Sequence, residues 1–114
     1  DWNMLLDPQG GPNHVQNWCV APILADTLTQ ELYYTPLYDV MRHFSAFIPR
    51  GSQRIAHSEL PEGIMALTVK RPDDKLVMVL LNSQQSDFPI SVDVADQKMN
   101  FTLPASSLQT LIVE

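Results

Sequence analysis

The sequence predicts an α+β fold in which a single helix is followed by an antiparallel β-sandwich. Three observations support this prediction. Residues 36–48 carry apolar side chains at helical spacing, and six short strand-like runs separated by turn residues follow Pro49. The third is the run "LVMVLL" at 76–81, which is apolar without alternation and therefore indicates a strand covered on both faces.

The first part of the chain mixes extended and loop signals. We expect "WNMLLD" to be a short buried strand and "DPQGGPN" to be a loop, because Pro, Gly, Asp and Asn are typical turn residues. "APILADT" is expected to be extended, and "LTQELYYT" is expected to be a turn that leads onward.

The clearest helix starts after Thr35, which we expect to be its N-cap. Pro36 suits the first helical position, where its missing N–H needs no partner. Pro49 should end the helix. One face carries an apolar stripe, formed by Leu37, Val40, Met41, Phe44, Phe47 and Ile48.

Six runs in the second part have the composition and spacing of strands. They are "QRIAHSEL", "IMALTVKR", "KLVMVLLN", "FPISVDVAD", "KMNFTLP" and "SLQTLIVE". Apolar and polar residues alternate in the fourth and fifth runs, so these strands should have one face in water. Such strands indicate a small sandwich whose edge strands need partners from outside this sequence.

Composition excludes several classes of function. The 114 residues are 45 % hydrophobic, enough for one folded domain, or for a small domain plus a piece of another. The formal net charge of −6 disfavours nucleic acid and anionic lipid as partners. Cys19 is the single cysteine and is expected to be a small buried hydrophobe. Because no initiator Met or targeting segment opens the chain, we expect an excised piece of a longer protein.

Metal and cofactor motifs are absent from the sequence, so we expect neither a metal nor a cofactor. His14, His43 and His57 lack ligand spacing, and "GG" alone lacks the spacing that wraps a phosphate. The glutamates stand in polar or terminal contexts, where a solvated role is the default: Glu31, Glu59, Glu62 and Glu114. "NFT" at Asn100 is a glycan acceptor in a secretory host, although such a tripeptide often arises by chance.

The opening stretch carries the most chemistry. Trp2 and Trp18 offer flat apolar faces, and Asn3, Asn13 and Asn17 offer amide groups, a combination that suits a sugar ring and its hydroxyls. Tryptophans in the core and asparagines that cap turns explain the same residues, and spacing alone favours this structural interpretation.

Several ordered blocks in the first half resemble glycoside hydrolase family 30, the glucosylceramidase-like glycosidases. The blocks are "DWN", "GGPN", "NWC" with "API" and Asp after it, and "HFSAFIPRGSQR". The resemblance implies that residues 1–48 are the terminal β/α unit of the catalytic barrel, with the last strand and helix of a (β/α)8 TIM barrel. It also implies that residues 49–114 are a C-terminal β-sandwich accessory domain.

The resemblance further implies a retaining β-glycosidase that hydrolyses β-glucosides, with glucosylceramide a candidate substrate. Its two catalytic glutamates would lie in the missing upstream barrel region, so this chain alone would be inactive and hold no catalytic residue. Trp2 and Asn17 match substrate-binding positions of the family. Asp1 precedes the tryptophan in the motif and is a candidate only for a supporting role without substrate contact. Trp18, Val20 and His14 depart from common family residues and put the aglycone preference in doubt. The family favours a secreted or otherwise extracytoplasmic location.

A second hypothesis stays open beside the enzyme. The chain would then be a free-standing, non-catalytic β-sandwich that binds carbohydrate or a protein. The two hypotheses make different demands on the strand "DWNMLLD". In the enzyme it pairs with barrel strands outside this sequence, whereas a free module has to pair or cover it with its own residues. A purely structural role is favoured for residues 49–114, whose polar positions are scattered and lack an aromatic platform.

Overall fold

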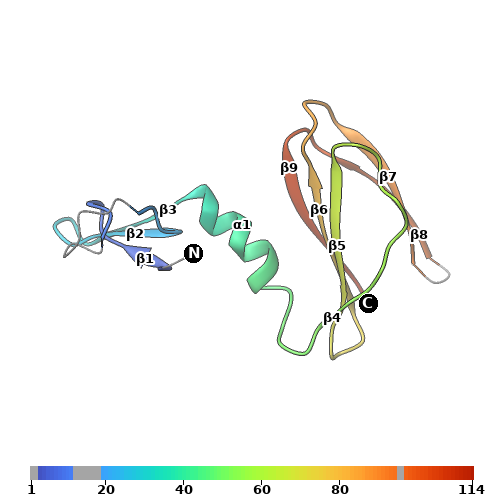
Figure 1. Cartoon of the computed structure of the whole chain (residues 1–114), viewed down its shortest axis with the longest axis horizontal. Coiled ribbons are helices and arrows are strands. Elements are labelled where there is room, and N and C mark those ends of the chain that lie inside the picture. Colours follow the sequence, from blue (N-terminus) through green and yellow to red (C-terminus); the bar gives the residue numbers. More distant parts are fainter. Residues whose placement is uncertain (1–2, 12–18, 95–96) are drawn as a thin grey trace. The chain divides into compact units, whose positions relative to one another are not determined.

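The computed structural model describes residues 3–11, 19–94 and 97–114. Within these ranges the chain forms nine strands and one helix (Figure 1). It divides between Arg42 and His43 into two compact units, which are described separately.

The first unit contains a three-stranded sheet in the order β1-β2-β3. Its strands are β1 (Leu5–Leu6), β2 (Ile23–Asp26) and β3 (Glu31–Tyr34). β1 runs parallel to β2, with Leu5 opposite Ile23, and β2 pairs with β3 as an antiparallel hairpin. The extended segment expected in "APILADT" is therefore confirmed as β2. β1 is shorter than the predicted run "WNMLLD", and the prediction that this strand is buried was wrong, because Leu5 is exposed in the described structure.

The prediction for "LTQELYYT" was wrong in part, because its second half is strand β3. The Asp26 carboxylate accepts hydrogen bonds from the backbone N–H groups of Leu28, at 2.8 Å, and Thr29, at 3.2 Å. Gln30 then adopts a φ of 60°, which closes the turn. The reversal is thus complete by Glu31, and Glu31–Tyr34 pairs back onto β2.

The predicted helix is present as α1 (Pro36–Ser45), which ends three residues before Ile48. One helix-like bond follows, from the Ile48 N–H to the Phe44 carbonyl at 3.0 Å, before Pro49 stops the backbone pattern. Thr35 precedes the helix as predicted, and its hydroxyl donates to the carbonyl of Pro22 at 3.1 Å. This residue therefore links the helix start to the start of β2.

The second unit contains strands in all six predicted runs, although the first run, "QRIAHSEL", is a strand only at Gln53–Arg54. They are β4 (Gln53–Arg54), β5 (Ile64–Lys70), β6 (Leu76–Asn82), β7 (Phe88–Val94), β8 (Gln97–Leu103) and β9 (Ser107–Val113). An antiparallel sheet has the order β4-β5-β6-β9, and β7 and β8 form a separate antiparallel hairpin. Figure 1 shows this hairpin, in orange, packed beside the β5-β6-β9 sheet.

The core of this unit lies between the sheet and the hairpin. Its buried members are Ile64, Met78, Leu80 and Leu103, and Phe88, Ile90 and Phe101 pack against them from the hairpin. β6 lies between β5 and β9, and Val77 to Leu80 are all buried. The prediction of a central strand covered on both faces is confirmed.

Candidate functional site

The residues predicted to bind substrate lie outside the part of the chain that the structure describes. Asp1, Trp2 and Asn17 fall outside the described residues, as do His14 and Trp18. The structure describes their neighbours, from Asn3 to Gly11 and from Cys19 onward.

Backbone hydrogen bonds position the start of this region. The Met4 carbonyl accepts from the Ile23 N–H at 3.1 Å, which joins β1 to β2. A tight turn follows, in which the Gln9 N–H donates to the Asp7 carboxylate at 3.0 Å and Gly10 has a φ of 71°. Because β1 begins at Leu5, Trp2 precedes this strand in the sequence, and Asn17 belongs to the connection between β1 and β2.

All four glutamates of the chain lie on the surface: Glu31, Glu59, Glu62 and Glu114. Glu31 accepts a hydrogen bond from the Tyr33 hydroxyl at 2.6 Å, which raises the pKa of Tyr33. Glu114 forms an ion pair with Lys75, and the hydrogen bond in this pair lowers the pKa of the Glu114 carboxyl. Retaining glycosidases hold two carboxyl groups about 5–5.5 Å apart in a pocket. The glutamates of this chain do not have that setting.

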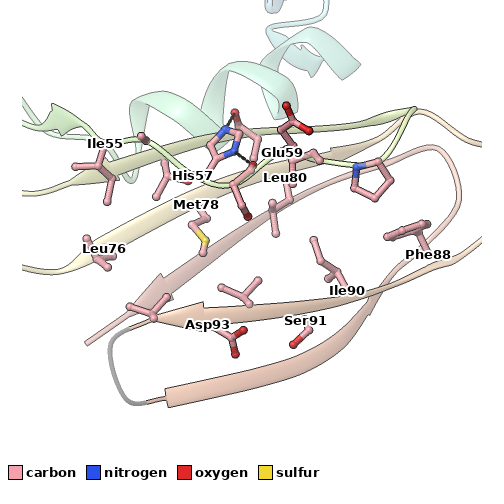
Figure 2. A pocket seen from close by; sticks show the side chains of 18 of the residues that line it. Ile55, His57, Glu59, Leu76, Met78, Leu80, Phe88, Ile90, Ser91 and Asp93 are labelled. Atoms are coloured by element: carbon pink, nitrogen blue, oxygen red, sulfur yellow. Dashed lines mark hydrogen bonds between the residues drawn. The ribbon is translucent and has the colours of Figure 1, made fainter.

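The second unit contains a cavity of about 470 Å³ between β5 and β6 on one side and β7 on the other. Figure 2 shows Met78 and Leu80 facing Ile90 and Phe88 across it, while Asp93 lies on the opposite side of β7. Thr68 also lines the cavity, and its buried hydroxyl has no hydrogen-bond partner among the described residues. The walls of this cavity are therefore mainly apolar and come from β5, β6 and β7 and from residues 55–61.

His57 is the titratable ring at this cavity, and its nitrogens face backbone carbonyls. Nδ1 lies 2.8 Å from the Ser58 oxygen, and Nε2 lies 3.3 Å from the Ala66 oxygen. A neutral imidazole has one N–H and can donate to only one of these acceptors. The contact with the Ala66 oxygen joins the segment after β4 to β5.

Among the described residues, no group of three or more His, Cys, Asp or Glu side chains could hold a metal ion. His43 contacts Thr110 instead, with 2.8 Å between Nδ1 and Oγ1. Cys19 is a free thiol and is half-buried rather than fully buried as predicted. In the parts of the chain that the structure covers, no helix has the length and apolar character needed to cross a membrane.

Two family models match consecutive parts of the chain. The model for the glycosyl hydrolase family 30 TIM-barrel domain matches residues 1–48, and the model for the beta sandwich domain of the same family matches residues 51–111. This chain belongs to glycosyl hydrolase family 30. The predicted fold class, part of a TIM barrel followed by an antiparallel β-sandwich, is confirmed.

Relatives of this family 30 chain support the same assignment. The lysosomal acid glucosylceramidase of Mus musculus is 37 % identical over 98 % of the chain, and putative glucosylceramidase 3 of Caenorhabditis elegans is 32 % identical over 98 %. The crystal structure of SrfJ from Salmonella typhimurium superposes with a TM-score of 0.92 at 30 % identity, over 99 % of this chain and 25 % of that one. The chain spans 22 % of the length of each of these two glucosylceramidases.

Proposed function

We propose that this chain is the C-terminal portion of a retaining β-glycosidase that hydrolyses β-glucosides, with glucosylceramide as the candidate lipid substrate. One observation carries the proposal: the barrel and sandwich models of family 30 match in succession along the chain. The substrate class is supported by relatives that are named glucosylceramidase or putative glucosylceramidase and match almost the whole chain.

In this proposal the boundary between the two domains falls between residues 48 and 49. Residues 1–48 would complete the catalytic barrel, and residues 49–114 would form the accessory sandwich. The two catalytic glutamates would come from barrel strands upstream of Asp1. The surface positions of all four glutamates in this chain support that arrangement.

Trp2 and Asn17 are proposed to form part of the wall of the glucose pocket. The indole of Trp2 would pack against the apolar face of the sugar ring, and the amide of Asn17 would hydrogen-bond to sugar hydroxyls. Asp1 would support the pocket without touching the substrate.

Exposed apolar residues in the first unit favour the enzyme over a free-standing binding module. Leu5, Leu32 and Tyr34 each leave about half or more of their surface exposed, with values of 51, 54 and 57 %. In the three-stranded sheet, β1 has a described partner on one side only. A free module would have to cover these positions itself, whereas in a barrel the neighbouring strands and helices cover them.

Substitutions at Trp2 in the full-length enzyme test the pocket assignment. Trp2→Ala removes the stacking face, so kcat/KM for a fluorogenic β-glucoside should fall about 10- to 100-fold. Trp2→Phe keeps an apolar ring and should lose less. Asn17→Ala should also reduce kcat/KM, whereas Gln9→Ala, at an exposed position of the same connection between β1 and β2, serves as its control and should change little. Turnover like that of the parent enzyme in Trp2→Ala would count against the assignment.

A further inference from the structure

The sequence contains one asparagine in an N-glycosylation sequon. Five asparagines occur in the chain, and only Asn100 is followed at the second position by Ser or Thr, in "NFT". Leu103 follows the tripeptide, so no proline interferes with it. Such a tripeptide arises often by chance, and the surroundings of its side chains decide whether a glycan fits.

The strand geometry separates the sequon from the core. Asn100, Phe101 and Thr102 lie on β8, where successive side chains point to opposite faces. Phe101 packs against the core cluster, while Asn100 and Thr102 are both exposed. The amide and hydroxyl groups of the sequon therefore share the solvent face of the hairpin.

The opposite strand leaves this face open. Asn100 pairs with Ser91 of β7, and the next residue of β7 on the same face is Asp93. Both of these side chains are exposed and small. A sugar attached to the Asn100 side chain can extend into water without displacing any residue of the core.

Asn100 also differs from the buried asparagine of the same domain. Asn82 is 0 % exposed, and its amide nitrogen lies within hydrogen-bond distance of the carbonyls of Ser86 and Pro104. Among the described residues, no hydrogen bond engages the side chains of Asn100 or Thr102. The Asn100 nitrogen is thus free to carry a substituent.

We propose that Asn100 is an N-glycan acceptor when the protein passes through a eukaryotic secretory compartment. The donor would be an oligosaccharide linked to a lipid through pyrophosphate. The Asn100 Nδ2 forms a bond to C1 of the first sugar, the bond from C1 to the pyrophosphate oxygen breaks, and the amide nitrogen loses one proton as the lipid pyrophosphate leaves. The glycan then covers the outer face of the β7–β8 hairpin.

The test uses the full-length protein directed into the endoplasmic reticulum of cultured animal cells. The purified, folded protein is treated with an amidase that releases N-glycans and converts each acceptor Asn to Asp, in water labelled with ¹⁸O. Peptide mass spectrometry should show labelled Asp at position 100. Recovery of the peptide with unmodified Asn100 from folded protein would overturn the proposal.

Variants on the same strand separate the glycan from other modifications and from folding defects. Thr102→Ala and Asn100→Gln should abolish the label at this position, while Thr102→Ser should keep it. Ser91→Ala changes the same face without touching the sequon and should keep it too. Thr102→Ala removes the sequon but leaves Asn100 in place. A label that persists at position 100 in this variant would therefore contradict glycosylation at the sequon. This test holds even if Asn100→Gln fails to fold.

Discussion

Among the described side chains of the sandwich, that of Asn82 makes the largest number of hydrogen bonds. Its Nδ2 lies 2.9 Å from the Ser86 carbonyl and 2.9 Å from the Pro104 carbonyl, and its Oδ1 accepts from the Gln84 N–H at 3.0 Å. The side chain thereby joins the end of β6 to the loop before β7 and to the end of β8. Because it is fully buried, water cannot replace these partners when the amide is removed.

We therefore predict that Asn82→Ala lowers the free energy of unfolding by about 3 kcal/mol, since each buried group left without a partner costs about 1–3 kcal/mol. Urea denaturation of the full-length protein measures this change. Asn100→Ala, in protein made in bacteria, is the matched control and should stay within about 0.5 kcal/mol of the parent. Equal effects of the two substitutions would refute the role assigned to Asn82.

Two threonines in the same domain should respond in opposite directions to substitution by Val. The buried Thr68 hydroxyl has no partner among the described residues, so Thr68→Val should stabilise the domain by about 1 kcal/mol. The Thr110 hydroxyl contacts His43 Nδ1 at 2.8 Å, so Thr110→Val should destabilise the domain by a similar amount. Thermal unfolding of both variants checks the signs, and a loss of stability in Thr68→Val would show that its hydroxyl has a partner.

At the level of elements, helix α1 carries an apolar stripe that this chain leaves partly uncovered. The described structure buries none of the helix residues, and Val40 and Phe44 are 46 and 38 % exposed. A short amphipathic helix depends on packing of its apolar face for most of its stability. The stripe thus indicates a surface that the proposed barrel would cover.

The substitution Phe44→Ala, made in the full-length enzyme and in residues 1–114 alone, tests whether the barrel covers the apolar stripe of α1. In the full-length enzyme we predict a loss of about 3–5 kcal/mol, the cost of a large cavity in a core. In residues 1–114 alone the loss should be clearly smaller, because the ring already contacts water. Chemical denaturation of both proteins gives the two values, with Ser45→Ala as a control on the exposed side of the helix. Equal losses would argue against a covering barrel.

The strands of the sandwich were predictable because their signals are local. Alternation along residues 88–94 and 97–103, together with turn residues between the runs, gives the hairpin directly. β3 was missed because the Asp26 carboxylate and the positive φ of Gln30 complete the turn earlier than composition suggests. The end of α1 was placed three residues late, since the apolar stripe continues through Ile48 although the regular hydrogen bonding stops at Ser45.

At the scale of the whole molecule, the proposed glucose pocket would need more side chains than this chain supplies. A TIM-barrel enzyme collects its active-site side chains from the ends of several barrel strands, and residues 1–48 would supply few of them. The spacing of Trp2 and Asn17 in the sequence therefore favoured a role in packing and turns. Their assignment to the glucose pocket came from the resemblance to the family. The cavity between the sheets offers no substitute, because its walls are mainly apolar and its His57 is engaged with backbone carbonyls.

Hydrolysis of a fluorogenic β-glucoside is the measurement that tests the central claim most directly. It compares the full-length enzyme, residues 1–114 alone, and residues 1–114 mixed with the separately produced upstream region. We predict activity in the full-length enzyme, none in residues 1–114 alone, and recovery of activity in the mixture. Turnover by residues 1–114 alone would contradict the claim that the catalytic glutamates lie upstream, and an inactive full-length enzyme would contradict the proposed β-glucosidase activity.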